Sequence, residues 1–142
     1  MRYELATMSG SYLTLSYEHA TVGDAMRAGV FTCEPGDSLR TVARIMATQH
    51  VHCVLVSSEA QPLAGLVTGL DLLKAAAAGT IDTAAEAASS PLVTAEPAEP
   101  LRAAVTRMAA ANATHAIVVR DGQPVGVLSA ADVAGIIAWG EA

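Results

Sequence analysis

Hydrophobic and polar positions follow two different periods along the chain, and each period predicts a different kind of element. Apolar residues at a helical spacing predict amphipathic helices that begin at Leu39 and at Leu101. After the last strand of each half a further helix is expected, and Gly79 and Gly140 stand where left-handed C-caps would fall. Short apolar runs bounded by turn residues predict strands at residues 30–33, 53–57, 64–68, 92–95, 116–119 and 125–129.

The predicted elements occur in the same order twice: helix, strand, helix, strand, strand, helix. Residues 21–79 align with residues 83–140 at nearly every element. Two copies of a unit of about 60 residues are too few for a solenoid, so we expect one domain with pseudo two-fold symmetry. We assign residues 1–20 to an N-terminal lead-in, residues 21–80 to the first repeat and residues 81–142 to the second.

The most closely repeated phrase is GLVTGLD at residues 65–71 and GVLSAAD at residues 126–132. A hydroxyl residue three positions before an acidic residue at a helix start is a capping box, worth about 1 kcal/mol. A strand-to-helix junction also presents free N–H groups to an anion, and a carboxylate there can accept two hydrogen bonds from the vicinal hydroxyls of a ribose. Both roles stay open at this point. The capping pattern occurs four times, in the pairs Thr21/Asp24, Thr68/Asp71, Thr83/Glu86 and Ser129/Asp132.

Composition and charge exclude several classes of protein. The chain has 142 residues, is 52% hydrophobic and carries a formal net charge of -6, so it can form a core but offers no basic surface for nucleic acid. Neither a signal peptide nor an apolar run of about 18 residues is visible, so we expect a cytoplasmic protein outside the membrane. The two cysteines, Cys33 and Cys53, form no CxxC pair, which is consistent with a reducing compartment.

These phrases together resemble a tandem pair of CBS (cystathionine-beta-synthase) domains, also called a Bateman module. The resemblance covers residues 21–140 and is carried by DAM at residues 24–26, by the two phrases above, and by VHCVLV and THAIVV at the middle strands. It implies a mixed α/β (α+β) fold of two βαββα repeats, with sheets packed face to face about a pseudo two-fold axis. It also implies a homodimer, and two clefts that bind an adenosine-containing ligand such as AMP, ADP, ATP or S-adenosylmethionine.

The resemblance further implies which residues would bind this ligand. Leu70 and Ala131 stand where many family members carry a basic residue, and Leu55 and Ile117 replace a common proline. Fewer cations favour a mono- or diphosphate, or a neutral adenosyl group, over a triphosphate. The ribose would be held by Thr68, Asp71, Ser129 and Asp132, the adenine side would be formed by Val30, Phe31, Thr32, Leu92, Val93 and Thr94, and the phosphate side by His52 and His115.

The remaining candidates favour structural roles. His50 and His52 could share one strand face as half of a metal site, but a third ligand is missing nearby, so no metal is predicted. Trp139 is expected at a dimer contact or at the edge of the core, and YLTLSY at residues 12–17 beside the sheet or the dimer. The side chains expected in the core are Cys33, Met46, Cys53 and Met108.

Two functions remain from these patterns. The first is a non-catalytic regulatory module that requires no cofactor, senses an adenosine-containing ligand and signals in trans to an unknown protein partner. The alternative is a dimerisation or protein-interaction module with unoccupied clefts, in which the hydroxyl–aspartate pairs serve only as caps. An enzyme is not predicted, because the sequence shows no nucleophile with a base and so no catalytic residue.

Overall fold

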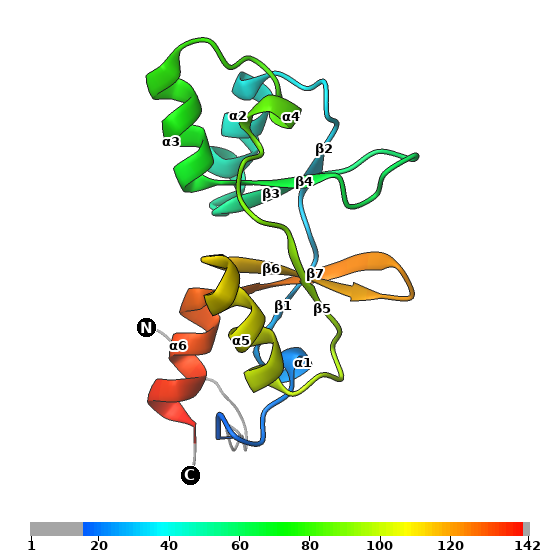
Figure 1. The fold of residues 1–142 in the computed structure, drawn as a ribbon, viewed down its shortest axis with the longest axis vertical. Coiled ribbons are helices and arrows are strands. Elements are labelled where there is room, and N and C mark those ends of the chain that lie inside the picture. The colour runs from blue at the N-terminus through cyan, green and yellow to red at the C-terminus, as the bar shows by residue number, and fades with distance from the viewer. Residues whose placement is uncertain (1–15, 141–142) are drawn as a thin grey trace. The chain divides into compact units, whose positions relative to one another are not determined.

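The structure is a computed structural model that describes residues 16–140, and these residues form two units with one sheet each (Figure 1). Unit 1 contains residues 16–28, 93–120 and 126–140, whereas unit 2 contains residues 29–92 and 121–125. The mixed α/β fold expected from the sequence is confirmed, with two sheets and six helices in the described part of the chain. Most of the predicted lead-in, including the strand-like start of YLTLSY, lies outside the described residues.

Unit 2 has a three-stranded sheet with the order β2-β3-β4. β2 is parallel to β3, with Thr32 opposite Leu55, and β4 is antiparallel to β3, with Thr68 opposite Cys53. All four residues of β3 are buried, and Val54 and Val56 share one core with residues of the helices of the unit. The elements of this unit are β2 (Thr32–Cys33), α2 (Leu39–Gln49), β3 (Cys53–Val56), β4 (Gly65–Thr68), α3 (Gly69–Ala78) and α4 (Ala84–Ala87).

Unit 1 has a four-stranded sheet with the order β1-β7-β6-β5. β5 is parallel to β6, and β1 adds an antiparallel edge in which Ala28 lies opposite Gly126. Leu101, Ile117 and Leu128 are fully buried in its core. The elements are α1 (Val22–Ala25), β1 (Arg27–Ala28), β5 (Val93–Ala95), α5 (Leu101–Ala111), β6 (His115–Arg120), α6 (Ala130–Trp139) and β7 (Gln123–Ser129), whose first three residues belong to unit 2.

Each repeat places its opening helix in the unit built mainly by the other repeat. The helix α1 begins the first repeat but contacts α5 and α6 in unit 1, and the backbone N–H of Val22 donates to Glu99 O at 2.9 Å. The helix α4 begins the second repeat but contacts α2 and α3 in unit 2, where Leu39 N donates to Asp82 O at 2.8 Å. Figure 1 shows α1 beside α5 and α4 beside α2. A four-residue helix is unstable alone, so tertiary packing of this kind is what maintains it.

The local signals in the sequence were accurate at most element ends. All four predicted capping boxes are present, and Gly79 ends α3 in the left-handed conformation with φ 72°. The expectation for Gly140 is wrong, because its φ of -69° is an ordinary extended one. The proposed strand face of His50 and His52 is also wrong, since His50 is the left-handed C-cap of α2 with φ 54°. The two-residue strand β1 was not predicted, because it has no periodicity to detect.

Candidate functional site

The two motif segments occupy the same position in their units, at the junction of a strand and the helix that follows it. Thr68 ends β4 and is the N-cap of α3, and Ser129 ends β7 and is the N-cap of α6. In each case the hydroxyl accepts from the backbone N–H of the motif aspartate, and the carboxylate accepts from the N-cap backbone. The structural role of the motif, a capping box, is therefore confirmed in both repeats.

The glycine that opens each motif admits the opening segment of the other repeat. A Cβ atom at Gly126 would lie 2.6 Å from the backbone oxygen of Arg27, which is closer than such atoms approach in proteins. At Gly65 a Cβ atom would lie 3.1 Å from the Cβ atom of Ala88. Ala88 directly follows α4, and Arg27 comes two residues after the end of α1. Glycine at these positions thus permits the close approach that brings the next residues to the motif aspartate.

The carboxylate of Asp71 is buried and accepts four hydrogen bonds. Only 3% of the residue is exposed. Its Oδ1 accepts from the hydroxyl of Ser89 at 2.6 Å, and its Oδ2 accepts from the hydroxyl of Ser90 at 2.7 Å. Oδ2 also accepts from Thr68, from its N–H at 2.9 Å and its hydroxyl at 3.1 Å. Because a carboxylate has about four lone-pair sites, this one is nearly saturated by its own chain.

The surroundings of Asp71 act on its pKa in opposite directions. Burial raises the pKa of the carboxyl, but the bonds donated by Ser89, Thr68 and Ser90 stabilise the charged form. The hydrogen bonds together outweigh burial, so the pKa of Asp71 lies below its ordinary value of 3.8. The carboxylate is therefore ionised at neutral pH.

This lowered pKa predicts a pH dependence of stability. A carboxylate with a pKa lower in the folded than in the unfolded chain stabilises the fold above the unfolded value, and this stabilisation is lost as the pH falls through the folded value. Below about pH 5, we expect the free energy of unfolding to fall more steeply for the unchanged chain than for Asp71→Asn. Urea unfolding at a series of pH values measures both curves. Parallel curves would show that Asp71 gains no protonation-dependent stability on folding.

The carboxylate of Asp132 has fewer partners than that of Asp71. Its Oδ1 accepts from Nε of Arg27 at 3.2 Å, and its Oδ2 accepts from the backbone N–H of Ser129 at 2.9 Å. Its side chain is 9% exposed, whereas that of Arg27 is 80% exposed. An ion pair with so exposed a partner contributes little to stability. The carboxylate of Asp132 is thus mostly buried, whereas the Arg27 side chain that donates to it is exposed to solvent.

Arg27 and Ser89 are equivalent residues of the two repeats. Each comes two positions after the last residue of a short helix, α1 or α4. Arg27 donates to Asp132, and Ser89 donates to Asp71. In both units, therefore, a side chain from the opening segment of one repeat is hydrogen-bonded to the motif aspartate of the other repeat.

The residues predicted for the phosphate side lie near these junctions. The carbonyl of His52 accepts from Gly69 N at 3.1 Å, directly beside the first turn of α3, and the His52 side chain is exposed. In unit 1 the carbonyl of Thr114 accepts from Ala130 N at 2.9 Å, and His115 follows at the start of β6. The Nδ1 atom of His115 lies 2.9 Å from the hydroxyl of Thr114. Each unit thus brings one of these histidines to its own strand–helix junction.

The residues predicted for the adenine side are divided between the units. Val30, Phe31, Thr32 and Leu92 belong to unit 2, and Val93 and Thr94 belong to unit 1. Phe31 is 43% exposed although it is a large hydrophobic residue, and Val93 is buried in β5. Leu92 follows, by two residues, Ser90, whose hydroxyl donates to Asp71. In the described chain, the side chains that donate to the motif aspartates belong to none of these six residues but to Arg27, Thr68, Ser89 and Ser90.

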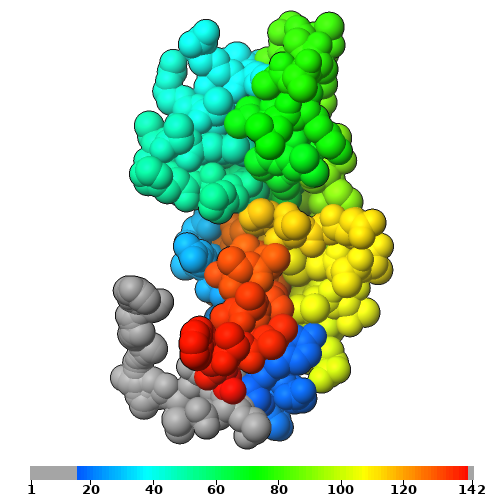
Figure 2. All heavy atoms as spheres, turned by 90° about the vertical axis from the view of Figure 1, so that its left-hand side faces the viewer, coloured from blue at the N-terminus to red at the C-terminus, as the bar shows by residue number. Residues whose placement is uncertain are grey.

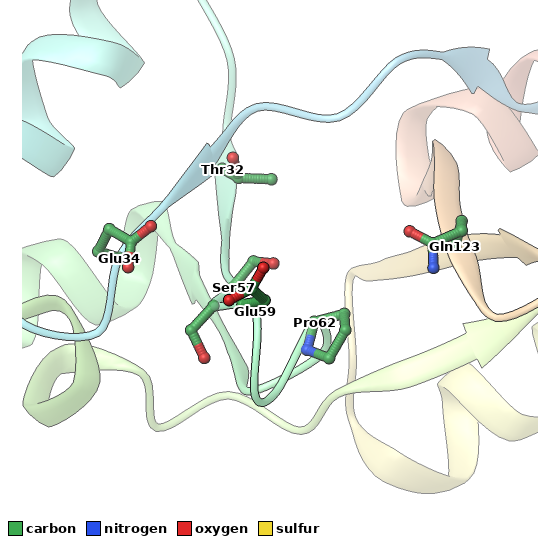
Figure 3. Close-up of a pocket in the computed structure, with 7 residues that line it drawn as sticks. Thr32, Glu34, Ser57, Glu59, Pro62 and Gln123 are labelled. Atoms are coloured by element: carbon green, nitrogen blue, oxygen red, sulfur yellow. The ribbon is translucent and has the colours of Figure 1, made fainter.

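A separate pocket of about 410 Å³ lies in unit 2, at the opposite end of β3 from Thr68 (Figure 3). Its lining contains two carboxylates, Glu34 and Glu59, and no basic side chain. A phosphate is repelled by such a lining, so this pocket does not suit a nucleotide phosphate. Sequence analysis had singled out only one of its residues, Thr32. The lining residues are Thr32, Glu34, Ser57, Ser58, Glu59, Pro62 and Gln123.

The other candidate features of residues 16–140 are a metal site, a reactive thiol and a membrane-spanning helix. Within this range no three His, Cys, Asp or Glu side chains are grouped so that they could hold a metal ion. Cys33 and Cys53 are buried free thiols, and burial raises the pKa of each to about 11, so both are protonated at neutral pH. Among the described helices, none has the length and apolar character needed to cross a membrane.

The comparison with protein families decides the identity of the repeats. The family model of the CBS domain matches the chain twice, at residues 22–78 and 84–138. The chain belongs to the CBS domain family. The two matches confirm the tandem CBS pair that the sequence resembles, and they fall on the two copies of the repeat. Among curated proteins, none matches the sequence.

Solved structures of CBS pairs share this fold. The CBS domain pair of protein MJ0100, in complex with 5'-methylthioadenosine and S-adenosyl-L-methionine, has a TM-score of 0.77 and 23% identity, over 84% of this chain and 96% of that one. A CBS domain protein from Pyrobaculum aerophilum, PAE2072, complexed with AMP, has a TM-score of 0.71 and 26% identity, over 79% and 88%. CBSX2 in complex with AMP has a TM-score of 0.67 and 21% identity, over 81% and 94%.

Sequence analysis of the CBS repeats missed the residues that bind the motif aspartates. Arg27, Ser89 and Ser90 lie outside every motif, and the Arg27–Asp132 pair joins residues of different repeats. The one available signal was the equivalence of Arg27 and Ser89, which both follow a capped opening helix. That signal does not reveal the partner, because a repeat alignment shows which positions correspond and not which positions touch.

Proposed function

We propose that this CBS pair is a non-catalytic regulatory module that senses an adenosine-containing ligand at its strand–helix junctions. The observation that supports it most is that each motif carboxylate lies at a helix N-terminus and is bonded to the opening segment of the other repeat. A ribose diol that bound such a carboxylate would displace the hydrogen bond between the carboxylate and that segment. Binding would then favour one state of the segment over another, which is what a sensor requires.

The chemistry of the junctions supports an adenosyl ligand with few phosphates. In three solved CBS pairs of similar fold the bound molecules contain adenosine, with one phosphate or none. Arg27 is the one basic side chain hydrogen-bonded to a motif aspartate in the described chain. We therefore propose AMP, ADP or an adenosyl thioether or sulfonium compound in preference to ATP. In this proposal the diol binds the motif aspartate, His52 or His115 lies toward the phosphate, and the segments at residues 30–32 and 92–94 lie toward the adenine.

Exposed apolar side chains support a role in assembly. On α3, Leu70 is 59% and Leu73 is 68% exposed, and on α6, Ile137 is 63% and Trp139 is 77% exposed. Figure 2 shows the outer surfaces of both helices, α3 in green and α6 in orange to red. Large apolar side chains at such exposure are typical of interfaces. We propose that these helices form a homodimer and that the module signals in trans to a cytoplasmic protein partner.

A thermal-shift titration tests the ligand. We expect AMP, ADP or S-adenosylmethionine at about 100 times its Kd to stabilise the fold by about 2.7 kcal/mol, which raises the Tm by several degrees. The 2',3'-dideoxy form of AMP should give no shift, because it lacks the diol. The double change Asp71→Asn/Asp132→Asn should remove the response, whereas Asp24→Asn, which alters the capping box of α1, should keep it.

The same samples also test the alternative function, a dimerisation or protein-interaction module. If none of these compounds raises the Tm while light scattering shows a dimer, the chain is an assembly module in which the aspartates serve only as caps. A shift that 2',3'-dideoxy-AMP also produces would contradict the assignment of the diol to the aspartate.

A further inference from the structure

The two motif aspartates stand at equivalent positions of the repeats but differ in the groups that donate hydrogen bonds to their carboxylates. Asp71 receives one serine hydroxyl on each carboxylate oxygen, from Ser89 at 2.6 Å and from Ser90 at 2.7 Å. These hydroxyls belong to neighbouring residues of one segment. The vicinal hydroxyls of a ribose would bind a carboxylate in the same manner, one to each oxygen. The chain thus presents to Asp71 an internal substitute for the diol.

Little room is left at Asp71 for a ligand. The residue is 3% exposed, and its Oδ2 accepts two further bonds from Thr68. The hydroxyls of Thr68 and Ser90 also lie 3.1 Å apart, which links the segment to the N-cap of α3. A sugar could reach this carboxylate only by displacing both serines, and each displaced hydroxyl would lose a short bond to a charged group.

The opening segment near Asp132 carries a different pair of residues from the one near Asp71. Arg27 and Ala28 are the repeat equivalents of Ser89 and Ser90, so the second hydroxyl is replaced by a methyl group. Among residues 16–140, the side chain that donates to Asp132 is the guanidinium of Arg27, at 3.2 Å and 80% exposed. This side chain can turn into solvent at small cost, and it remains available to a phosphate once it leaves the carboxylate.

We propose that the CBS pair binds one adenosyl ligand per chain, with the ribose diol on Asp132, and that Ser89 and Ser90 keep the Asp71 site closed. This inference rests on the proposed function, since it assumes that the ligand carries a diol. It assigns different roles to the two sites. Asp132 is the sensing residue, and Asp71 anchors the segment at residues 89–90 to the first turn of α3.

An exchange of the two residue pairs tests the inference. Equilibrium dialysis with radiolabelled AMP, or with S-adenosylmethionine, should give one ligand per unchanged chain. The double variant Arg27→Ser/Ala28→Ser should lower the affinity at least 10-fold, because it supplies the serine pair to Asp132. The reverse variant Ser89→Arg/Ser90→Ala should raise the number of bound ligands to two. Single changes Asp24→Asn and Glu86→Gln, in the capping boxes of α1 and α4, are the matched controls for stability.

The outcomes separate this inference from the proposed function. Two ligands per unchanged chain, or one ligand that Asp132→Asn leaves in place, would overturn the inference while the proposed function stands. Absence of binding by every compound would overturn the proposed function and the ligand assignment together. The closure of Asp71 is then decided without ligand by carbon-13 NMR of its carboxyl group. A pKa of this carboxyl group that lies below its ordinary range, and that rises in the variant Ser89→Ala/Ser90→Ala, supports closure. A pKa that the variant leaves unchanged refutes it.

Discussion

Replacement of Asp71 by alanine is expected to lower the free energy of unfolding by about 3–5 kcal/mol, because it leaves several buried donors without an acceptor. Thr68, Ser89 and Ser90 direct their hydroxyls at this carboxylate, and the residue is 3% exposed. The segment at residues 89–90 would also lose its link to α3. Urea unfolding at pH 7 measures the loss.

Glu86→Ala is the matched control for that change. Glu86 completes the same kind of capping box, on α4, but its side chain is exposed. We expect a much smaller loss there, since water replaces the carboxylate at an exposed cap. Equal losses for the two variants would mean that Asp71 acts only as a cap and that its bonds to Ser89 and Ser90 contribute nothing.

The second large effect is expected at Gly126. Alanine there would place its Cβ atom 2.6 Å from the backbone oxygen of Arg27 and 3.3 Å from the side chain of Met26. Backbone atoms cannot move aside as the end of a side chain can, so β1 would separate from β7. We expect a loss of about 1–3 kcal/mol, together with the loss of the Arg27–Asp132 bond, measured by urea unfolding and amide exchange of β1.

Alanine variants of two other glycines serve as comparisons for Gly126→Ala. Gly135 lies in α6 with open space around the position of a Cβ atom, so Gly135→Ala should stabilise the chain by about 0.5–1 kcal/mol. Gly65→Ala should lie between the two, because its nearest neighbour is the side-chain Cβ atom of Ala88 at 3.1 Å. If Gly126→Ala were as stable as the unchanged chain, the strand pairing of Ala28 with Gly126 would not be rigid.

Local features of the fold could be predicted because their causes are local. The capping box of Thr68 and Asp71 needs only residues three positions apart, and the left-handed turn at Gly79 needs only glycine. The helices and most strands follow from periodicity, which the repeat shows twice. The prediction of a left-handed C-cap at Gly140 was wrong because a glycine after a helix permits that conformation without requiring it.

The candidate site could be predicted only in part, because half of it depends on contacts between distant residues. The sequence indicated Thr68, Asp71, Ser129 and Asp132, and the structure shows all four at strand–helix junctions. Their assignment to a ribose remains a prediction. The partners of the carboxylates could not be foreseen, because Arg27 and Asp132 are 105 residues apart and an arginine on a short edge strand has no sequence signature.

The exchange of opening helices also bears on synthesis at the ribosome. The helix α1 emerges early, but α5 and α6, which it contacts, emerge much later. The elements of unit 2, from β2 to α4, follow one another without interruption. Contacts between residues far apart in sequence form slowly, and they cannot form before both partners exist. Translation therefore supplies β2 to α4 of unit 2 before it supplies α5, β6 and α6 of unit 1, although unit 1 begins first.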